Sequence, residues 1–217
     1  MRAFKVKRGG AIAVLFAVLL LAAPAAASTA AAETNVNQAV VKTVTDYLEG
    51  LTTLKAHFVQ TAEDGTQRAG TFYLNRPGKM RIVYDPPDKD FIVADGLFIH
   101  YYDASTERTS SALISSSVAD FFLRKHLKVA GNVSVSAAAQ KGNLLSMTVV
   151  QTKNPLAGSL TLVFGKAPLR LTSWSVVDAE GLTTTVALSN IKTGIKFKSD
   201  LFHYYDPARA AHLYNEN

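Results

Sequence analysis

The sequence predicts an α+β protein that is mainly β, with about ten antiparallel strands curled into a sheet or barrel and two or three helices on one side. Three observations carry this prediction. One early segment has apolar residues at helical spacing, most later segments alternate apolar and polar residues, and turn-forming dipeptides separate the alternating segments. A chain of 217 residues with 48% hydrophobic composition suits one well-buried domain.

The first residues are typical of a secretory signal. Basic residues within positions 2–8 precede an uncharged apolar run at 11–23, which is shorter than the ~20 residues of a membrane-spanning helix. We expect a cleaved signal peptide at 1–27, with an alternative cleavage site after Ala32. The remainder, 33–217, is expected to be a single domain.

Removal of the signal leaves the chain nearly neutral. Four of the 23 Lys and Arg lie in the signal, and none of the 17 Asp and Glu do. The remaining chain therefore has 19 basic and 17 acidic residues, a net charge of about +2. The mature part has no long Lys/Arg cluster, and we therefore expect no binding to nucleic acid. The sequence contains no Cys, so the exported domain must depend on its own core rather than on disulfides.

Segment 36–51 predicts the first helix, because its apolar residues recur at spacings of three and four, with Gly50 as the C-cap. Strand-like runs with alternating apolar residues follow. Turn dipeptides such as Asp64-Gly65, Pro77-Gly78 and Asp95-Gly96 separate them and indicate an antiparallel meander. These runs span residues 54–62, 67–75, 79–84, 90–94 and 97–103.

A second helix is predicted within "SSSVADFFLRKHL", where Val118, Phe121 and Phe122 have helical spacing behind a serine run that can cap. Alternation resumes after it, and the final segment from Phe202 onward carries no clear pattern. The later strand-like runs span residues 127–137, 144–151, 158–165, 169–178 and 182–191.

The sequence contains none of the common catalytic or nucleotide-binding motifs, and we expect neither an enzyme nor a cofactor. Five scattered His without Cys give no metal-ligand spacing, so we expect no metal site. Asp85, Asp88 and Asp90 lie close together in a Pro-rich turn, where carboxylates are expected to remain solvated. A hydrolytic carboxylate pair there is the alternative.

Large apolar side chains share one face of several predicted strands. Met80, Ile82 and Tyr84 share a face of one strand, and Phe72 and Leu74 share a face of its neighbour, on which Arg76 follows at the hairpin. Periodicity alone does not distinguish a packed core from a cavity. For the strand at 97–103 either parity can face inward. The inward set is Leu97, Ile99 and Tyr101, or else Phe98, His100 and Tyr102.

The stretch "GTFYLNRPGKMRIVYDPPDKDFIVADGLFIHYYD", with Phe58 and Gln60 before it, resembles the LolA family, periplasmic carriers that ferry lipoproteins from the inner to the outer membrane of Gram-negative bacteria. The matching features are Arg76-Pro77, an aromatic followed by Pro at 84–86, and Asp95-Gly96 before an aromatic strand. The resemblance is strong over residues 40–125 and weaker to about 206.

This resemblance implies an incompletely closed antiparallel β-barrel of about ten or eleven strands with an α-helical lid over an apolar cavity. It also implies a monomer in the periplasm that takes acylated lipoproteins as cargo from an inner-membrane ABC transporter and delivers them to an outer-membrane acceptor. The residues then expected to contact acyl chains are Phe58, Phe72, Leu74, Met80, Ile82, Tyr84, Trp174 and Val176.

The resemblance further implies that Arg76, next to Pro77, bonds to the helical lid and keeps it closed when the carrier is empty. Val118, Phe121 and Phe122 would belong to the lid helix. Met80 stands where family members often carry an aromatic residue. Two other functions remain open at this point: a carrier or sensor of another lipid on the same fold, and a secreted hydrolase.

Overall fold

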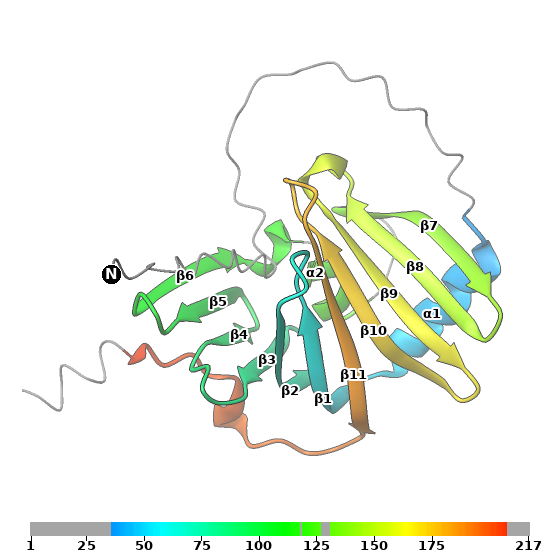
Figure 1. Ribbon diagram of the computed structural model, residues 1–217. Helices are drawn as coiled ribbons and strands as arrows, with labels where there is room; N and C mark the ends of the chain where they lie inside the picture. Colours follow the sequence, from blue (N-terminus) through cyan, green and yellow to red (C-terminus); the bar gives the residue numbers. More distant parts are fainter. Residues whose placement is uncertain (1–35, 118, 127–130, 208–217) are drawn as a thin grey trace, which may run out of the picture.

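The computed structural model describes residues 36–117, 119–126 and 131–207, whose strands form one antiparallel sheet of 11 strands. The sheet order is β6-β5-β4-β3-β2-β1-β11-β10-β9-β8-β7, and the end strands β6 and β7 do not pair with each other. The sheet curves, and α1 and α2 lie against its concave side (Figure 1). The prediction of a mainly β, incompletely closed barrel with helices on one side is confirmed. The elements are α1 (Gln38–Gly50), β1 (Thr53–Thr61), β2 (Gln67–Asn75), β3 (Lys79–Tyr84), β4 (Phe91–Asp95), β5 (Phe98–Asp103), β6 (Arg108–Leu113), η1 (Ile114–Ser116), α2 (Ala119–Leu123), β7 (Val133–Lys141), β8 (Leu144–Gln151), η2 (Pro155–Ala157), β9 (Ser159–Lys166), β10 (Leu169–Val177), β11 (Thr183–Thr193) and η3 (Ser199–Phe202).

Most predicted strands match the structure to within one or two residues. The runs predicted at 67–75, 79–84 and 144–151 coincide with β2, β3 and β8. Of the run predicted at 127–137, residues 127–130 lie outside the described residues, and the remainder was placed too early, because β7 starts at Val133 and continues to Lys141. Strand β6 is missing from the prediction. Its residues "RTSSAL" are mostly small and polar, and an edge strand that buries little carries a weak apolar pattern.

Helix α1 begins where Asn37 caps it and buries one face in the barrel. The Asn37 Oδ1 accepts hydrogen bonds from the backbone N–H of Ala39 at 3.0 Å and of Val40 at 3.3 Å. Gly50 is not the C-cap but the last helical residue, and Leu51 continues in an extended conformation. Among the described residues, no helix combines the length and the apolar composition needed to cross a membrane.

The register of the sheet decides which side chains face inward. Met80 on β3 pairs with Leu74 on β2 and with Ala94 on β4, and Ala94 pairs with Ile99 on β5. Directly opposed residues share a face, so the buried Ile99 lies on the concave side with Met80. The inward set of β5 is therefore Ile99 and Tyr101, while Phe98, His100 and Tyr102 face outward.

A glycine allows two aromatic rings to meet at one end of the inner face. Gly70 on β2 pairs with Phe58 on β1 and with Tyr84 on β3. The two rings form an edge-to-face contact with centroids 5.4 Å apart. Because Gly70 has no side chain, the rings can approach across the strand between them.

The segment after β11 packs along the convex face of the sheet. Arg81 Nη1 donates a hydrogen bond to the carbonyl of Leu201 in η3 at 3.2 Å. Tyr204 stacks on His100 of β5 with ring centroids 4.3 Å apart. The segment from the end of β11 to Tyr204 therefore covers outward-facing side chains of β3 to β5. The helices lie on the other, concave side of the sheet (Figure 1).

We predict that Gly70→Ala destabilises the fold. A Cβ at Gly70 would collide with the carbonyl oxygen of Val83 and lie 2.8 Å from the Phe58 ring. Overpacking of this kind typically costs about 1–3 kcal/mol, and contact with backbone favours the upper end. Urea unfolding measures the loss. Gly50→Ala is the control, because nothing lies within 4 Å of its added Cβ and its free energy of unfolding should not fall.

Candidate functional site

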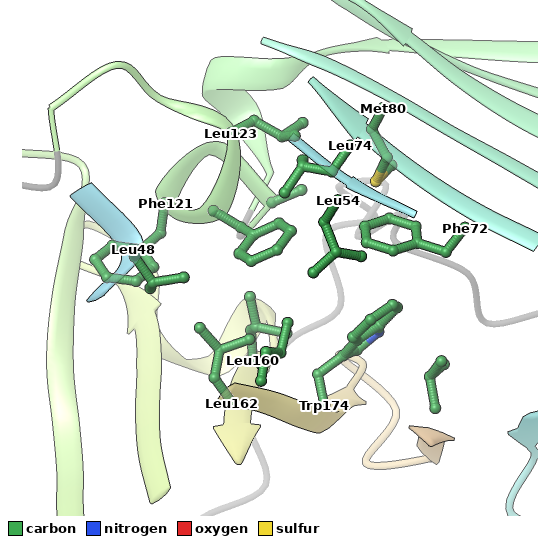
Figure 2. Close-up of a cluster of buried hydrophobic side chains, with 14 of the residues drawn as sticks. Leu48, Leu54, Phe72, Leu74, Met80, Phe121, Leu123, Leu160, Leu162 and Trp174 are labelled. Atoms are coloured by element: carbon green, nitrogen blue, oxygen red, sulfur yellow. The ribbon is translucent and has the colours of Figure 1, made fainter. Parts of the chain in front are cut away.

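An apolar cavity lies between the concave face of the sheet and α2. Its walls come from β2, β3, β9, β10 and α2. Figure 2 shows five of its lining side chains, Phe72, Met80, Leu160, Leu162 and Trp174, within the cluster of buried apolar residues. Phe122 of α2 approaches Phe72 with ring centroids 6.3 Å apart, and Trp174 approaches Phe72 from the opposite wall at 5.0 Å. The lining residues are Phe72, Met80, Ile82, Ala119, Phe122, Leu160, Leu162, Trp174 and Val176.

The structure brings together most of the residues predicted to contact acyl chains. Leu74 is fully buried beside the cavity without lining it. Phe58 and Tyr84 lie farther along the inner face, at its polar end. Ala119, Leu160 and Leu162 line the cavity and are absent from the predicted set, although the alternation of β9 signalled the two leucines.

The lid segment is short. Phe121 and Phe122 both belong to α2 and are buried, whereas Val118 lies outside the described residues. The cavity beneath α2 has a volume of about 30 Å³. That is room for roughly two water molecules and not for a long hydrocarbon chain. Any large apolar ligand must therefore displace α2 or the side chains under it.

Arg76 connects the β2–β3 hairpin to both helical segments. Its Nη1 donates to the carbonyl of Leu48 and, at 3.3 Å, to that of Leu51, both at the end of α1. Its Nη2 donates to the carbonyl of Arg124, just after α2, at 2.7 Å. The Leu48 carbonyl also accepts from the backbone N–H of Leu51 at 3.2 Å. One planar guanidinium therefore donates to acceptors at two separate helix ends, where few carbonyls have partners within the helix.

The hairpin makes a second, backbone contact with α2. The N–H of Gly78 donates to the carbonyl of Leu123 at 2.7 Å, and Pro77 between Arg76 and Gly78 is exposed. Burial lowers the pKa of the Arg76 guanidinium, an effect that nearby Glu49 opposes. The group nevertheless stays charged, because an arginine pKa lies far above neutrality. The hairpin thus contacts the end of α2 through one cation and one backbone hydrogen bond.

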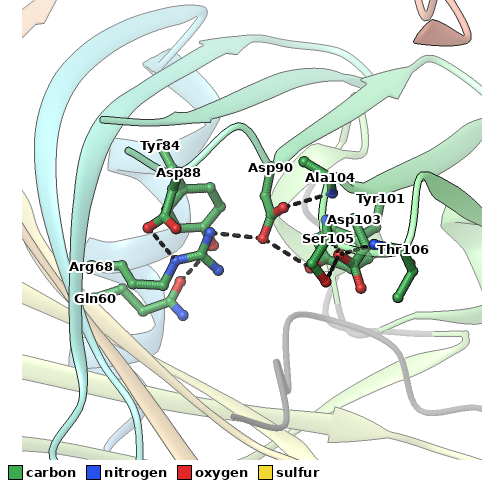
Figure 3. Close-up of polar contacts among 10 residues, drawn as sticks. All are labelled: Gln60, Arg68, Tyr84, Asp88, Asp90, Tyr101, Asp103, Ala104, Ser105 and Thr106. Atoms are coloured by element: carbon green, nitrogen blue, oxygen red, sulfur yellow. Dashed lines mark hydrogen bonds and ion pairs between the residues drawn. The ribbon is translucent and has the colours of Figure 1, made fainter. Parts of the chain in front are cut away.

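A polar cluster occupies the opposite end of the inner face (Figure 3). Arg68 donates to Asp88 at 2.9 Å and to Asp90 at 2.8 Å, and its guanidinium lies 3.8 Å from the centre of the Tyr84 ring. Tyr84 donates to Gln60 Oε1 at 2.8 Å. Burial raises the pKa of Tyr84 to about 12, so the phenol remains a donor at neutral pH.

The expectation that all three aspartates are solvated is wrong for Asp90. Asp85 is exposed and Asp88 is half-buried, but Asp90 is buried and its two oxygens accept hydrogen bonds from Arg68, Tyr101 and the backbone N–H of Ala104. These partners make it one half of a structural ion pair. Within the described ranges, no three His, Asp or Glu side chains come together in a way that could hold a metal ion.

Comparison with known proteins identifies the family. The family described as "Outer membrane lipoprotein carrier protein LolA" matches residues 49–205. The chain belongs to the LolA family. This is a family of carriers rather than of enzymes, and the earlier resemblance is confirmed.

Two relatives carry the name of this family. An outer-membrane lipoprotein carrier protein of Bordetella pertussis is 30% identical over 193 residues, which cover 87% of this chain and 88% of the relative. The protein of the same name from Methylococcus capsulatus is 26% identical over 170 residues, 75% of this chain and 81% of the relative. Among solved structures, a LolA superfamily protein from Nitrosomonas europaea is 9% identical with a TM-score of 0.42 and covers 79% of this chain and 99% of its own.

We predict that Asp90→Ala lowers the free energy of unfolding by about 3 kcal/mol, because it leaves the largely buried Arg68 with the outer Asp88 but without its inner partner. Asp85→Ala is the matched control. It removes an exposed contact with His57 Nε2 at 3.3 Å, and exposed pairs contribute about 0–1 kcal/mol. Urea unfolding of both variants measures the difference. Equal losses would contradict a structural role for the Asp90 ion pair.

Proposed function

We propose that this protein is a periplasmic carrier that binds the acyl chains of lipoproteins released from the inner membrane and delivers them to the outer membrane. The observation that carries the proposal is the set of hydrogen bonds from Arg76 to two helix ends. These helices cover an apolar cavity that is too small for cargo. The barrel wall supplies the apolar surface, and the helices form a lid that must open to admit acyl chains.

A lid with a favourable closed state solves an energetic problem of carriage. Burial of one methylene contributes roughly 0.8 kcal/mol, so two or three long acyl chains could supply tens of kcal/mol, beyond the ~20 at which non-covalent affinity saturates. Cargo held so tightly would not be released. The hydrogen bonds of Arg76 and Gly78 must break when the lid opens, and their loss is subtracted from the net affinity.

Export and partners complete the proposal. Residues 1–27 act as the signal peptide, with cleavage after Ala32 as the alternative, and the remainder works as a monomer that binds one lipoprotein at a time. The sequence holds no nucleotide-binding motif, so energy for loading must come from a partner, an inner-membrane ABC transporter. An outer-membrane acceptor receives the cargo.

Release of lipoprotein from membranes tests this function. Purified mature protein is incubated with donor-complex proteoliposomes that carry a labelled lipoprotein, and the soluble label is measured. The proposal expects a soluble one-to-one complex that forms only when the protein is present. Absence of release, together with another lipid found in the cavity by mass spectrometry, would assign the carrier to that lipid instead.

We predict that Arg76→Leu still accepts lipoprotein but transfers it poorly. The variant loses three carbonyl hydrogen bonds that favour the closed lid, so bound cargo no longer competes with closure. Arg81→Leu is the matched control, because Arg81 is similarly buried but bonds to Leu201 on the convex face. The fraction of loaded lipoprotein passed to the acceptor is measured for each. Normal transfer by Arg76→Leu would contradict the proposed lid role.

The single tryptophan gives a direct test of where acyl chains bind. Trp174 lines the cavity and is 9% exposed. We predict that a lipopeptide with brominated acyl chains quenches Trp174 fluorescence, because the heavy atoms come into contact with the indole. The same lipopeptide without bromine is the control. Binding of the brominated probe without quenching would place the acyl chains elsewhere.

A further inference from the structure

Strands β10 and β11 separate in the middle of the sheet. From the hairpin that joins them they pair from Val177 opposite Thr183 to Ser173 opposite Ala187, and the ladder between them stops at this second pair. The rest of β10, Leu169–Thr172, lies beside β9 alone, and the rest of β11, Leu188–Thr193, lies beside β1 alone. In Figure 1 the two ribbons diverge toward their lower ends.

The separation forms a groove with two unpaired strand edges. Its volume is about 710 Å³, which falls within the range of ligand-binding clefts. Backbone irregularities lie where the two strands separate: the pairing of β10 with β9 shifts its register between Leu171 and Ser173, and Asn190 of β11 adopts a φ of 51°. An edge of this kind presents backbone N–H and C=O groups that another extended chain can use.

The groove has an apolar floor and a polar rim. The floor residues are partly buried and pack against the core, whereas the rim residues are exposed. Tyr47 of α1 contributes to the floor, its ring against Phe164 with centroids 5.4 Å apart. The floor is formed by Tyr47, Leu169, Leu188 and Ile191, and the rim by Arg170, Ser189, Asn190 and Thr193.

The groove lies beside the lid and the cavity. Tyr47 immediately precedes Leu48, whose carbonyl accepts from Arg76. Thr172 lies two residues from Trp174 of the cavity wall, a distance of roughly 7 Å along a strand. Acyl chains that enter under the lid would therefore leave the peptide attached to them next to this groove.

We propose that the groove between β10 and β11 binds the extended peptide that follows the acylated N-terminus of the cargo, by strand addition to the free edge at Leu188–Thr193. This inference rests on the proposed function and deepens it. Recognition through main-chain groups tolerates almost any side-chain sequence, which suits a carrier of many lipoproteins. The free edge of six residues matches the length of an ordinary short strand.

Synthetic dipalmitoyl lipopeptides test the proposal on the unmodified mature protein. The probes share one lipid and carry one residue, six residues, or six residues with N-methyl groups on alternate positions. We expect the six-residue probe to bind about tenfold more tightly than the one-residue probe, as a few net hydrogen bonds would give. N-methylation of one set of alternate positions should abolish the gain, and N-methylation of the other set should preserve it.

The outcomes separate the two claims. Equal affinity for all probes would overturn the groove proposal and leave the carrier function intact. Failure of every probe to bind, including the one-residue lipopeptide, would overturn the carrier function itself.

Disulfide trapping locates the peptide, since the chain has no Cys of its own. Ser189→Cys places a thiol on the rim, and Thr185→Cys places one on the same strand where β11 is paired with β10. A six-residue probe with a Cys in its peptide should cross-link to the first variant and not to the second. Equal cross-linking of both variants would overturn the assignment.

Discussion

The contact of one guanidinium with the ends of two helical segments is the interaction on which the rest of the structure depends. Arg76 lies in the β2–β3 hairpin at the edge of the barrel wall, and its acceptors lie at the ends of α1 and α2. A lid held only by apolar packing would be released by any apolar ligand. Hydrogen bonds from a half-buried cation add a directional term that acyl chains cannot replace, so closure of the lid and filling of the cavity oppose each other.

The barrel that carries this contact has an inner face built in register. Opposed pairs across β1 to β5 place large apolar residues on the concave side, and Gly70 lets Phe58 and Tyr84 meet. The ion pair of Arg68 with Asp90 fixes the far end, while the strand separation beside Arg170 leaves the sheet open near the lid. One sheet thus carries the apolar concave face, the end held by the Arg68–Asp90 ion pair, and the groove that we propose for the attached peptide.

Much of this could be predicted from the sequence, because alternation and turn dipeptides report local structure directly. β2 and β3 were placed to the residue, and Arg76 was located at the hairpin. Burial of Asp90 could not be predicted, since its partner Arg68 lies 22 residues away and only the folded sheet brings them together. The weak strand β6 and the separation of β10 from β11 also depend on neighbouring strands rather than on local composition.

The central claim, that cargo opens a lid which Arg76 keeps closed, is tested most directly by a distance measurement. Spin labels on Lys125→Cys, after α2, and Thr185→Cys, on the exposed side of β11, report the position of the lid relative to the wall. The empty protein should give one narrow distance distribution, and a dipalmitoyl lipopeptide should shift it to a longer and broader one. An unchanged distribution while the lipopeptide is bound would contradict the account.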